Sequence, residues 1–390
     1  MMTSKDLHQV EHPLFVQTLQ EPIPSAYVHV PFCGSICAYC AFERTLYQDK
    51  LAQTWLDQIT QEIQRELHQA KLQDPTFRLQ TIYIGGGTPT RLSLEALDQL
   101  LSCFQGFLTP QGEWTIEANP ESLTLEKLLL LKRHGINRLS IGIQSFNDQR
   151  LASLGRNHTA KEAKEAFGRA RKVGFENISV DLMYGFFDQS LEELDQDLDA
   201  FLALDAEHLS IYSLILEPNT LLSKKKTPEI EESLGALLYE HIEKRLEAAG
   251  YEHYEVSSYA KEHHYGLHNT LIWLDGLYYG FGYGAIGRNE KGLHRFDGSL
   301  RQYVGGQGTR LYEEDTNPWF DALMTGLRTR FGVDIEAWQA RYGFNFFQKY
   351  QSVLEKYRDL LRVEKGHLVV NSQGMEILDT ILVDFLMEDC

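Results

Sequence analysis

Residues 27–40 of this 390-residue chain read YVHVPFCGSICAYC, a short apolar stretch followed at once by Cys33, Cys37 and Cys40. Three thiolates on one short loop can each bind one iron of a cubic [4Fe–4S] cluster, which normally takes four cysteines. The fourth iron then keeps an open position, which is typical of a reactive metal site rather than a structural one. The Cys-x3-Cys-x2-Cys spacing therefore predicts a reactive iron–sulfur cluster directly after a first strand.

Zinc, or plain buried cysteines, are the alternatives for this motif. Zinc takes four tetrahedral ligands, commonly from a second cysteine pair, and the chain has five cysteines in all. Cys103 stands in a helical pattern of leucines and is expected in the core, and Cys390 is the last residue. His29 could be a fourth ligand, but its strand is expected to point it away from the loop. The spacing favours the cluster, and zinc stays as the alternative.

The composition indicates an ordinary globular protein, with 43% hydrophobic and 24% charged residues. No stretch approaches the ~18 consecutive apolar residues of a membrane span, and residues 1–21 lack the apolar region of a secretory signal. A cytoplasmic location is expected, because a reducing compartment suits a thiolate-held cluster. The formal net charge of −18 argues against a general nucleic-acid binder.

Short apolar runs alternate with amphipathic helical patterns between residues 26 and 212. The predicted strands are 26–30, 81–84, 114–117, 138–143, 177–182 and 208–212. The predicted helices between them are 51–70, 94–104, 125–134, 160–173 and 191–204. Ser93 and Thr124 stand where N-caps are expected, and Gly135 and Gly174 where helices end. Six strand–helix repeats predict an α/β fold with a parallel sheet, and periodicity leaves open whether that sheet closes into a barrel.

The pattern changes after residue 212. A long helix is predicted over 229–249, and the aromatic, glycine-rich residues 251–287 fit neither a helix nor an ordinary strand. Helical patterns at 321–329, 335–342, 347–361 and 375–387 then surround a small hairpin, which predicts a winged-helix-like domain. The predicted division is an N-terminal extension 1–24, a core 25–215, an extension 216–305 and a C-terminal domain 306–390.

Glycine and polar residues stand where the predicted parallel strands end. The carboxyl ends of parallel strands gather ligands at one edge of a sheet. The segments are 85–89 (GGGTP), 117–120 (EANP), 144–146 (QSF) and, on the fifth strand, Asp181. Any one of them alone is often a tight turn or a helix cap. Together with the cysteine loop they indicate a ligand site.

In combination and order these motifs resemble the radical S-adenosylmethionine (SAM) proteins, within the family of oxygen-independent coproporphyrinogen III oxidase and most of all its heme chaperone branch. The resemblance covers nearly the whole chain from residue 27. Its segments are 27–33, 85–90, 116–120, 138–146, 154–158 and 268–269. It implies a partial (β/α)6 barrel in which Cys33, Cys37 and Cys40 bind a [4Fe–4S] cluster. The open iron would chelate SAM, and one electron would release a 5′-deoxyadenosyl radical.

The resemblance also implies cofactor contacts beyond the cysteines. Gly86 and Gly87 match a turn whose backbone meets the methionyl end of SAM, where a side chain would block the approach. Tyr39 matches an aromatic residue placed against adenine, and other positions match a second SAM site in the oxidase. The residues carried over to cofactor binding are Tyr27, Tyr39, Phe42, Gly86, Gly87, Thr88, Glu117, Gln144, Arg156 and Asp181.

The chain departs from the oxidase pattern at several positions. Phe42 stands where the oxidase has a fourth cysteine, which favours the chaperone branch and disfavours oxidase activity. Ala41 replaces a usual Asp, residues 185–187 (GFF) replace Gly-Leu-Pro, and Ile286 replaces a His. Residues 268–273 (HNTLIW) replace His-Asn-x-x-Tyr-Trp. Most of these departures lie toward the substrate end.

His268 is the candidate axial ligand for heme, because a neutral imidazole binds heme iron well. Asn269 and Trp273 complete the heme candidates, and the aromatic residues nearby, up to 281, could stack on a porphyrin. The alternative is a hydrogen-bonded core histidine, since the chain has fourteen histidines.

The resemblance implies a heme chaperone that passes heme to an acceptor protein. The alternatives are a radical SAM enzyme that decarboxylates or opens a tetrapyrrole, and a methyltransferase that uses two SAM molecules. An iron–sulfur regulator with a winged-helix DNA reader is disfavoured by the acidic charge. The implied partners are heme or a related tetrapyrrole, a reductant such as flavodoxin or ferredoxin, and a heme acceptor; a weak membrane-associated partner is compatible, and nucleic acid is not expected.

Overall fold

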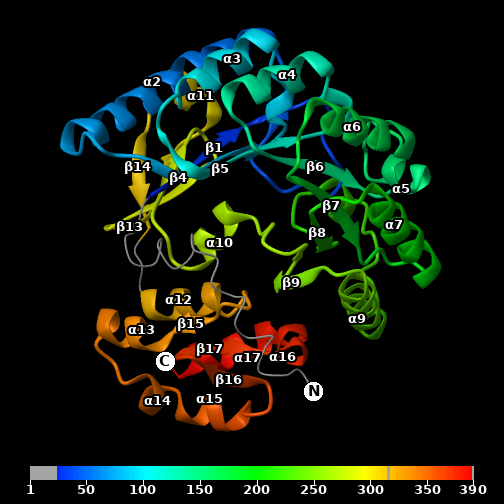
Figure 1. Cartoon of the computed structure of the whole chain (residues 1–390), viewed down its shortest axis with the longest axis vertical. Coiled ribbons are helices and arrows are strands. Elements are labelled where there is room, and N and C mark those ends of the chain that lie inside the picture. Colours follow the sequence, from blue (N-terminus) through cyan, green and yellow to red (C-terminus); the bar gives the residue numbers. More distant parts are fainter. Residues whose placement is uncertain (1–23, 314–316, 389–390) are drawn as a thin grey trace.

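The computed structural model describes residues 24–313 and 317–388, so residues 1–23 of the predicted N-terminal extension and Cys390 lie outside the described residues. In the described part a 12-stranded sheet runs in the order β14-β13-β12-β11-β1-β4-β5-β6-β7-β8-β10-β9. The sheet curves so that helices cover its outer side, while α10 and the C-terminal unit lie on its inner side (Figure 1). The open, curved sheet is a partial barrel rather than a closed one.

The central six strands are mutually parallel neighbours and confirm the predicted alternation. They are β1 (Ser25–Val30), β4 (Leu79–Gly86), β5 (Leu108–Ala118), β6 (Arg138–Gln144), β7 (Ile178–Tyr184) and β8 (His208–Ser213). The helices between them are α2 (Asp49–Gln73), α3 (Leu94–Ser102), α4 (Leu125–His134), α5 (Asp148–Ser153), α6 (Ala160–Val173) and α7 (Leu191–Leu204). The hydroxyls of Ser93 and Thr124 accept hydrogen bonds from the Ala96 and Lys127 amides, as N-caps do.

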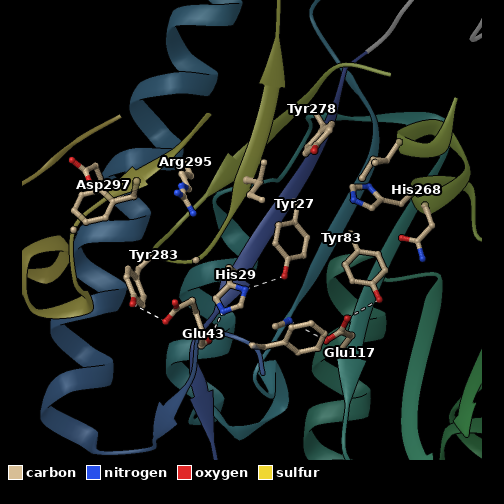
Figure 2. Close-up of a pocket in the computed structure, with 18 of the residues that line it drawn as sticks. Tyr27, His29, Glu43, Tyr83, Glu117, His268, Tyr278, Tyr283, Arg295 and Asp297 are labelled. Atoms are coloured by element: carbon tan, nitrogen blue, oxygen red, sulfur yellow. Dashed lines mark hydrogen bonds between the residues drawn. The ribbon is translucent and has the colours of Figure 1, made fainter. Parts of the chain in front are cut away.

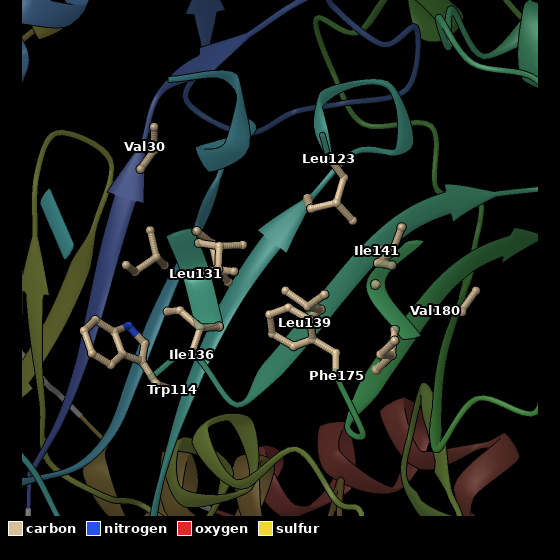
Figure 3. Packing of buried hydrophobic residues seen from close by; sticks show 14 of the residues in the cluster. Val30, Trp114, Leu123, Leu131, Ile136, Leu139, Ile141, Phe175 and Val180 are labelled. Carbon is tan, nitrogen blue, oxygen red and sulfur yellow. The ribbon is translucent and has the colours of Figure 1, made fainter. Parts of the chain in front are cut away.

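The two faces of these strands differ in polarity. On the outer face apolar side chains such as Trp114, Leu139 and Val180 pack beneath the helices, with Leu131 and Phe175 from the helical layer (Figure 3). On the inner face, alternate residues of the same strands are polar, for example Thr81 and Glu113. Side chains of a strand alternate between its two faces. Each strand therefore contributes apolar side chains to the core on one face and polar side chains to the inner side of the sheet on the other.

The aromatic, glycine-rich stretch 251–287 contains regular strands, so the prediction that it was neither helix nor ordinary strand was wrong. It holds β9 (Glu252–Glu255), β10 (Ser258–Ala260), α10 (Leu267–Trp273), β11 (Tyr278–Phe281) and β12 (Ile286–Asn289), and is followed by β13 (Gly292–Asp297), α11 (Leu300–Val304) and β14 (Thr309–Tyr312). The strand β11 extends the parallel part of the sheet beside β1. A Cβ on Gly280 would lie 2.3 Å from the Ile286 carbonyl oxygen, so the glycines allow close strand pairing.

The helices before and after this stretch begin and end differently from the prediction. The long helix α9 spans Glu232–Ala248 and so starts three residues later than expected, after α8 (Leu221–Lys224). The single helix predicted over 347–361 is instead α14 (Phe346–Lys349) and α15 (Gln351–Lys356). Residues after Tyr357 leave the helix because β16 (Leu361–Glu364) pairs with β17 (His367–Val370) across a turn in which Lys365 and Gly366 both have positive φ.

The C-terminal unit has its own apolar core and a small antiparallel sheet, as expected of an appended domain. Its remaining elements are α12 (Pro318–Gly326), β15 (Val333–Asp334), α13 (Ile335–Tyr342), α16 (Ser372–Glu376) and α17 (Leu378–Met387). Backbone hydrogen bonds from Val256 to Arg328 and from Arg330 to Tyr254 join it to β9. The domain boundaries at 215 and 305 stay predictions. In the described part of the chain, no helix combines the length and apolarity that crossing a membrane requires.

Candidate functional site

The cysteine loop leaves the carboxyl end of β1. Cys33 ends the short strand β2 (Phe32–Cys33), which pairs with β3 (Thr45–Leu46), and the Ala38 amide donates to the Leu154 carbonyl at 2.9 Å. Cys33 is buried, whereas Cys37 and Cys40 are half-buried, and all three are free thiols. Thus the backbone holds three thiols on one partly covered loop, as a cluster site requires.

The three loop cysteines and His29 are not arranged as ligands of one zinc ion. In the part of the chain that the structure describes, no three potential ligands are placed to hold one metal ion. A cubic cluster instead takes each thiolate on a different iron. Both ring nitrogens of His29 are also engaged: Nε2 donates to the Glu43 carbonyl at 2.7 Å, and Nδ1 accepts from the Tyr27 hydroxyl at 3.0 Å. His29 is therefore not free to act as a fourth ligand.

The glycine turn after β4 lies directly against the cysteine loop. The amides of Gly87 and Thr88 donate to the carbonyls of Val30 and Phe32, both at 2.8 Å. A Cβ on Gly87 would come within 2.9 Å of the Cys33 sulfur. A side chain at this position would therefore collide with the cysteine loop, and the predicted contact of the turn with SAM stays a prediction.

The carboxylate of Glu117 joins this turn to the inner face of the sheet. One oxygen accepts from the Tyr83 hydroxyl at 2.8 Å, and the other accepts from the Gly86 amide at 2.9 Å. Burial raises the pKa of Glu117 from 4.5 to about 7, although both hydrogen bonds favour the charged form. A carboxyl that titrates near neutral pH at this position can respond to a nearby cation.

Arg156 places a cation beside the thiols. Its Nη1 donates to the Cys37 sulfur at 3.5 Å, and Nη2 donates to the Asn119 side-chain oxygen at 2.8 Å and to the Gly142 carbonyl. A neighbouring guanidinium stabilises a thiolate. The predicted residue Arg156 therefore lies where it can support the cluster end of the site.

The remaining residues that were predicted to bind the cofactors differ in their surroundings. Tyr39 packs against the small apolar cluster of Leu154, Met183 and Phe186, and burial raises its pKa. Asp181 accepts from the Ser140 hydroxyl at 3.0 Å, and burial raises the pKa of its carboxyl. Gln144 ends β6 with a positive φ of 73°, and the side chain of Phe42 is 67% exposed.

A pocket of about 700 Å³ joins the cluster end of the site to the candidate heme residues (Figure 2). This size is within the usual range for ligand pockets. The predicted residues that line it are Tyr27, Phe42, Gly86, Glu117, His268 and Asn269. Trp273 does not line it, and its ring lies 6.0 Å from the Arg328 guanidinium. Asp181 lines a smaller adjoining cavity of about 50 Å³, which Glu117 and Asn269 also line.

His268 is held inside the curve of the sheet by α10. Its Nδ1 lies 2.7 Å from the Thr81 hydroxyl, and its ring stacks on Tyr83 with centroids 5.0 Å apart. Its Nε2 is buried and has no hydrogen-bond partner among the described residues. Burial lowers the pKa of His268 to about 3, so the imidazole is neutral at ordinary pH. A neutral imidazole with an unengaged nitrogen is what a heme ligand requires.

Further polar residues on the inner face of β4 to β8 were not predicted as part of the site. They are Thr81, Tyr83, Glu113, Arg138, Ser140, Ser179, His208, Ser210 and Tyr212. The signal was present, because polar residues recur at every second position along β4 to β8, opposite the apolar set. Apolar runs identified the strands, and the alternate polar positions were not interpreted as a site.

Comparisons with known proteins agree with this geometry. Residues 27–201 match the Radical SAM superfamily and residues 314–377 match the HemN C-terminal domain. "Heme chaperone HemW" of Bacillus subtilis is 38% identical over 369 residues, which cover 90% of this chain and 93% of that protein. The Lactococcus lactis protein of the same name is 32% identical over 385 residues, which cover 95% and 99%.

The solved structure of coproporphyrinogen III oxidase (HemN) from Escherichia coli superposes with a TM-score of 0.79 and covers 95% of this chain and 92% of its own. At 22% identity this likeness shows a common fold. The radical SAM superfamily is built around a [4Fe–4S] cluster and SAM, and the three thiols, the glycine turn and Arg156 fit that pair. The predicted family is confirmed: the chain belongs to the HemW family of radical SAM proteins and carries the HemN C-terminal domain.

Proposed function

We propose that this protein binds heme in the pocket through His268 and hands it to an acceptor protein. The observation that carries the proposal is His268 itself, which is part of the pocket lining and whose buried Nε2 has no partner among the described residues. A pKa lowered to about 3 keeps the ring neutral, which is the form that binds heme iron. Relatives that match most of the chain have the name "Heme chaperone HemW", which also supports heme as the ligand.

The walls of the pocket support a porphyrin as well. The rings of Tyr27, Tyr83 and Tyr278 line it near His268, and flat aromatic faces can stack on a macrocycle. Arg295 lines the far side of the pocket, where its guanidinium could pair with a propionate carboxylate. The pocket thus combines a histidine that can bind the iron, aromatic rings that can stack on the macrocycle, and an arginine that can pair with its propionates.

The cluster and SAM take a supporting role in this proposal. When bound, the cluster would offer its open iron to SAM, and the residues that would hold both lie around the Gly86–Glu117 contact at one end of the pocket. Phe42, which stands where the oxidase has a further cysteine, is exposed and provides no thiol. We therefore propose that SAM and the cluster control when heme is held or released, rather than drive oxidase chemistry.

One observation favours a second function, radical chemistry on a tetrapyrrole. Gly86 and Glu117 share the pocket with His268, so a porphyrin bound to His268 would lie beside the SAM position. Such an arrangement would also suit hydrogen abstraction from that porphyrin, or methyl transfer to it. Consumption of SAM distinguishes this candidate from the chaperone.

The proposed partners follow from these roles. A flavodoxin-like or ferredoxin-like protein would reduce the cluster, and a heme-using protein, soluble or weakly membrane-associated, would accept the heme. We propose a cytoplasmic location, because free thiols that hold a cluster need a reducing compartment.

Titration with heme tests the proposal on the full chain, purified without oxygen and reconstituted with its cluster. We expect one heme per chain with an imidazole-ligated absorption spectrum, and loss of that spectrum in His268→Ala. His294→Ala is the matched control, because His294 is also buried with an unpartnered nitrogen among the described residues but lies outside this pocket. Absence of stoichiometric heme in the parent protein contradicts the proposal.

A second assay separates the two candidates. The reduced protein is incubated with SAM and heme or coproporphyrinogen, and the products are analysed by mass spectrometry. A chaperone leaves the tetrapyrrole unchanged, whereas a radical enzyme forms 5′-deoxyadenosine together with a product of altered mass. Heme transfer is then measured spectroscopically with an apo heme protein as acceptor.

A further inference from the structure

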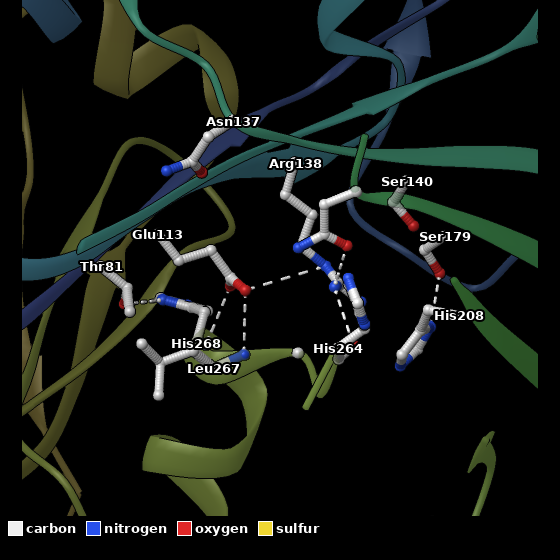
Figure 4. Close-up of polar contacts among 12 residues, drawn as sticks. Thr81, Glu113, Asn137, Arg138, Ser140, Ser179, His208, His264, Leu267 and His268 are labelled. Atoms are coloured by element: carbon white, nitrogen blue, oxygen red, sulfur yellow. Dashed lines mark hydrogen bonds and ion pairs between the residues drawn. The ribbon is translucent and has the colours of Figure 1, made fainter. Parts of the chain in front are cut away.

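The hydrogen bond between Thr81 and His268 bears on which imidazole nitrogen carries the proton. Thr81 Oγ1 lies 2.7 Å from Nδ1, and both side chains are buried (Figure 4). If Thr81 donated this bond, the proton would be on Nε2, a buried donor without a partner among the described residues. An unpaired buried donor is costly, and a protonated Nε2 cannot bind a metal. The favoured tautomer therefore has Nδ1–H donating to Thr81 and a lone pair on Nε2.

Glu113 fixes the helix that carries His268. Its two carboxylate oxygens accept from the amides of Leu267 and His268, both at 3.0 Å. These are the first amides of α10, and the residue before them, Gly266, has no side chain to cap the helix. A carboxylate from β5 therefore takes the place of a local N-cap and ties α10 to the sheet.

Arg138 completes this arrangement from the neighbouring strand β6. Its Nε lies 3.9 Å from the Glu113 carboxylate, and both residues are buried. Its Nη1 donates to the Asn177 side chain at 2.8 Å and to the His264 carbonyl at 3.2 Å, in the segment that leads into α10. The guanidinium thus compensates the buried carboxylate and also holds the chain just before the helix (Figure 4).

Strand register brings these groups together. Thr81 on β4 lies opposite Glu113 on β5, so both project from the inner face beneath α10. Thr81 sets the tautomer of His268, and Glu113 sets the position of its backbone. Neither side chain lines the pocket itself.

We propose that Thr81 and Glu113 are positioning residues that hold His268, a residue of the pocket lining, in its Nδ1–H form with the lone pair on Nε2. The identity of the ligand rests on the proposed heme binding, whereas the tautomer and the position belong to the protein alone. A hydrogen bond from Nδ1–H also increases the basicity of Nε2, and loss of such a contact typically weakens metal binding about 10–100-fold.

The tautomer is tested without any ligand. In protein labelled with ¹⁵N-histidine, we expect His268, assigned by its loss in His268→Ala, to show a protonated Nδ1 and an unprotonated Nε2. Thr81→Val removes the acceptor and should change this signal, while Thr81→Ser should keep it. Thr115→Val is the matched control, because Thr115 is equally buried on β5 and its hydroxyl has no partner among the described residues. A protonated Nε2 in the parent protein, or an unchanged signal in Thr81→Val, overturns the role of Thr81.

The role of Glu113 is tested by hydrogen exchange. Glu113→Gln should speed exchange of the Leu267 and His268 amides at least tenfold relative to amides in β6, while Thr81→Val leaves them unchanged. Unchanged exchange of these two amides overturns the role of Glu113.

Heme titration then separates the two proposals. We expect both variants to bind heme about 10–100-fold more weakly, with an altered axial-ligand spectrum. If His268→Ala leaves the heme spectrum intact, the proposed heme ligand is wrong, and the tautomer and exchange measurements still decide the positioning roles. If His268→Ala abolishes ligation but Thr81→Val and Glu113→Gln bind like the parent, the positioning proposal is wrong and the proposed function stands.

Discussion

The ring of Tyr83 stacks on the imidazole of His268, with centroids 5.0 Å apart and planes inclined by 27°, and its hydroxyl donates to Glu117 at 2.8 Å. Glu117 in turn accepts from the Gly86 amide in the turn beside the cysteine loop. One tyrosine therefore contacts both ends of the pocket. A change at either end has a direct physical route to the other through this side chain.

Two substitutions of Tyr83 should separate its contacts. Tyr83→Phe keeps the stack on His268 but loses the hydrogen bond, so we expect SAM to bind about tenfold more weakly, equivalent to about 1.4 kcal/mol, with an unchanged heme spectrum. Tyr83→Leu loses both and should also change the heme spectrum. Equilibrium binding of each ligand measures this. Tyr259→Phe is the control, because the Tyr259 hydroxyl is buried without a partner among the described residues; an equal effect there would contradict the assignment.

SAM binding should weaken as the pH falls below about 7. Burial raises the pKa of Glu117 from 4.5 to about 7, so at lower pH the carboxyl is mostly neutral and attracts the SAM ammonium less. We expect the Kd of SAM to rise by up to about tenfold per pH unit between pH 7 and 5. Glu117→Gln should bind weakly at every pH, with the slope removed. A Kd for the parent protein that stays constant from pH 5 to 8 would show that Glu117 does not contact SAM.

The same pKa shift has a consequence for stability without SAM. Because the folded pKa is above the unfolded one, the neutral acid is favoured in the fold. Its contribution to the free energy of unfolding is fully present below pH 4.5 and is lost as the pH rises through about 7. Glu117→Gln should therefore flatten this part of the pH profile in denaturant titrations, and an unchanged slope would count against the raised pKa.

Gly87→Ala should remove the cluster and leave the fold. The added Cβ would lie 2.9 Å from the Cys33 sulfur and 2.8 Å from the Phe32 carbonyl, so the loop must shift. We expect far less than four irons per chain after reconstitution, and a loss of stability of about 1–3 kcal/mol. Gly168→Ala, in the interior of α6 with open space around it, should keep the iron and gain about 0.5–1 kcal/mol. Full iron content in Gly87→Ala would refute the close approach.

Serine in place of each loop cysteine should abolish SAM binding together with the cluster. Cys33, Cys37 and Cys40 each supply one thiolate in the proposed site. Removing any one of them would therefore leave a second iron without a cysteine ligand. Cys103→Ser is the control, because Cys103 follows α3 and packs against the core far along the chain from the loop. Iron analysis and the visible spectrum of reconstituted protein measure the outcome. Normal iron content in all three loop variants would show that these cysteines do not hold the cluster.

The parallel core could be predicted because its information is local. Each of the six central parallel strands contains a short apolar run, and helices such as α3 and α4 have a cap, Ser93 or Thr124, next to them in the sequence. The glycine-rich extension could not be predicted in this way. Its strands are short, and Gly280 is there so that β11 can approach β12 closely, a reason that exists only once the two strands are paired.

The candidate site also has one part that local sequence predicts and one part that it does not. By itself the sequence determined the cluster end, since three cysteines within eight residues and the turn at 85–89 need only a short loop and a strand end to meet. It also determined that His268 was a candidate ligand. Only the tertiary structure decided which groups hold that histidine and its Nδ1, because Thr81 and Glu113 lie more than 150 residues away and reach α10 through strand register. A contact that depends on the pairing of distant strands leaves no local pattern. Trp273, five residues after His268 on α10, does not line the pocket and lies beside Arg328 instead, which also only the tertiary structure shows.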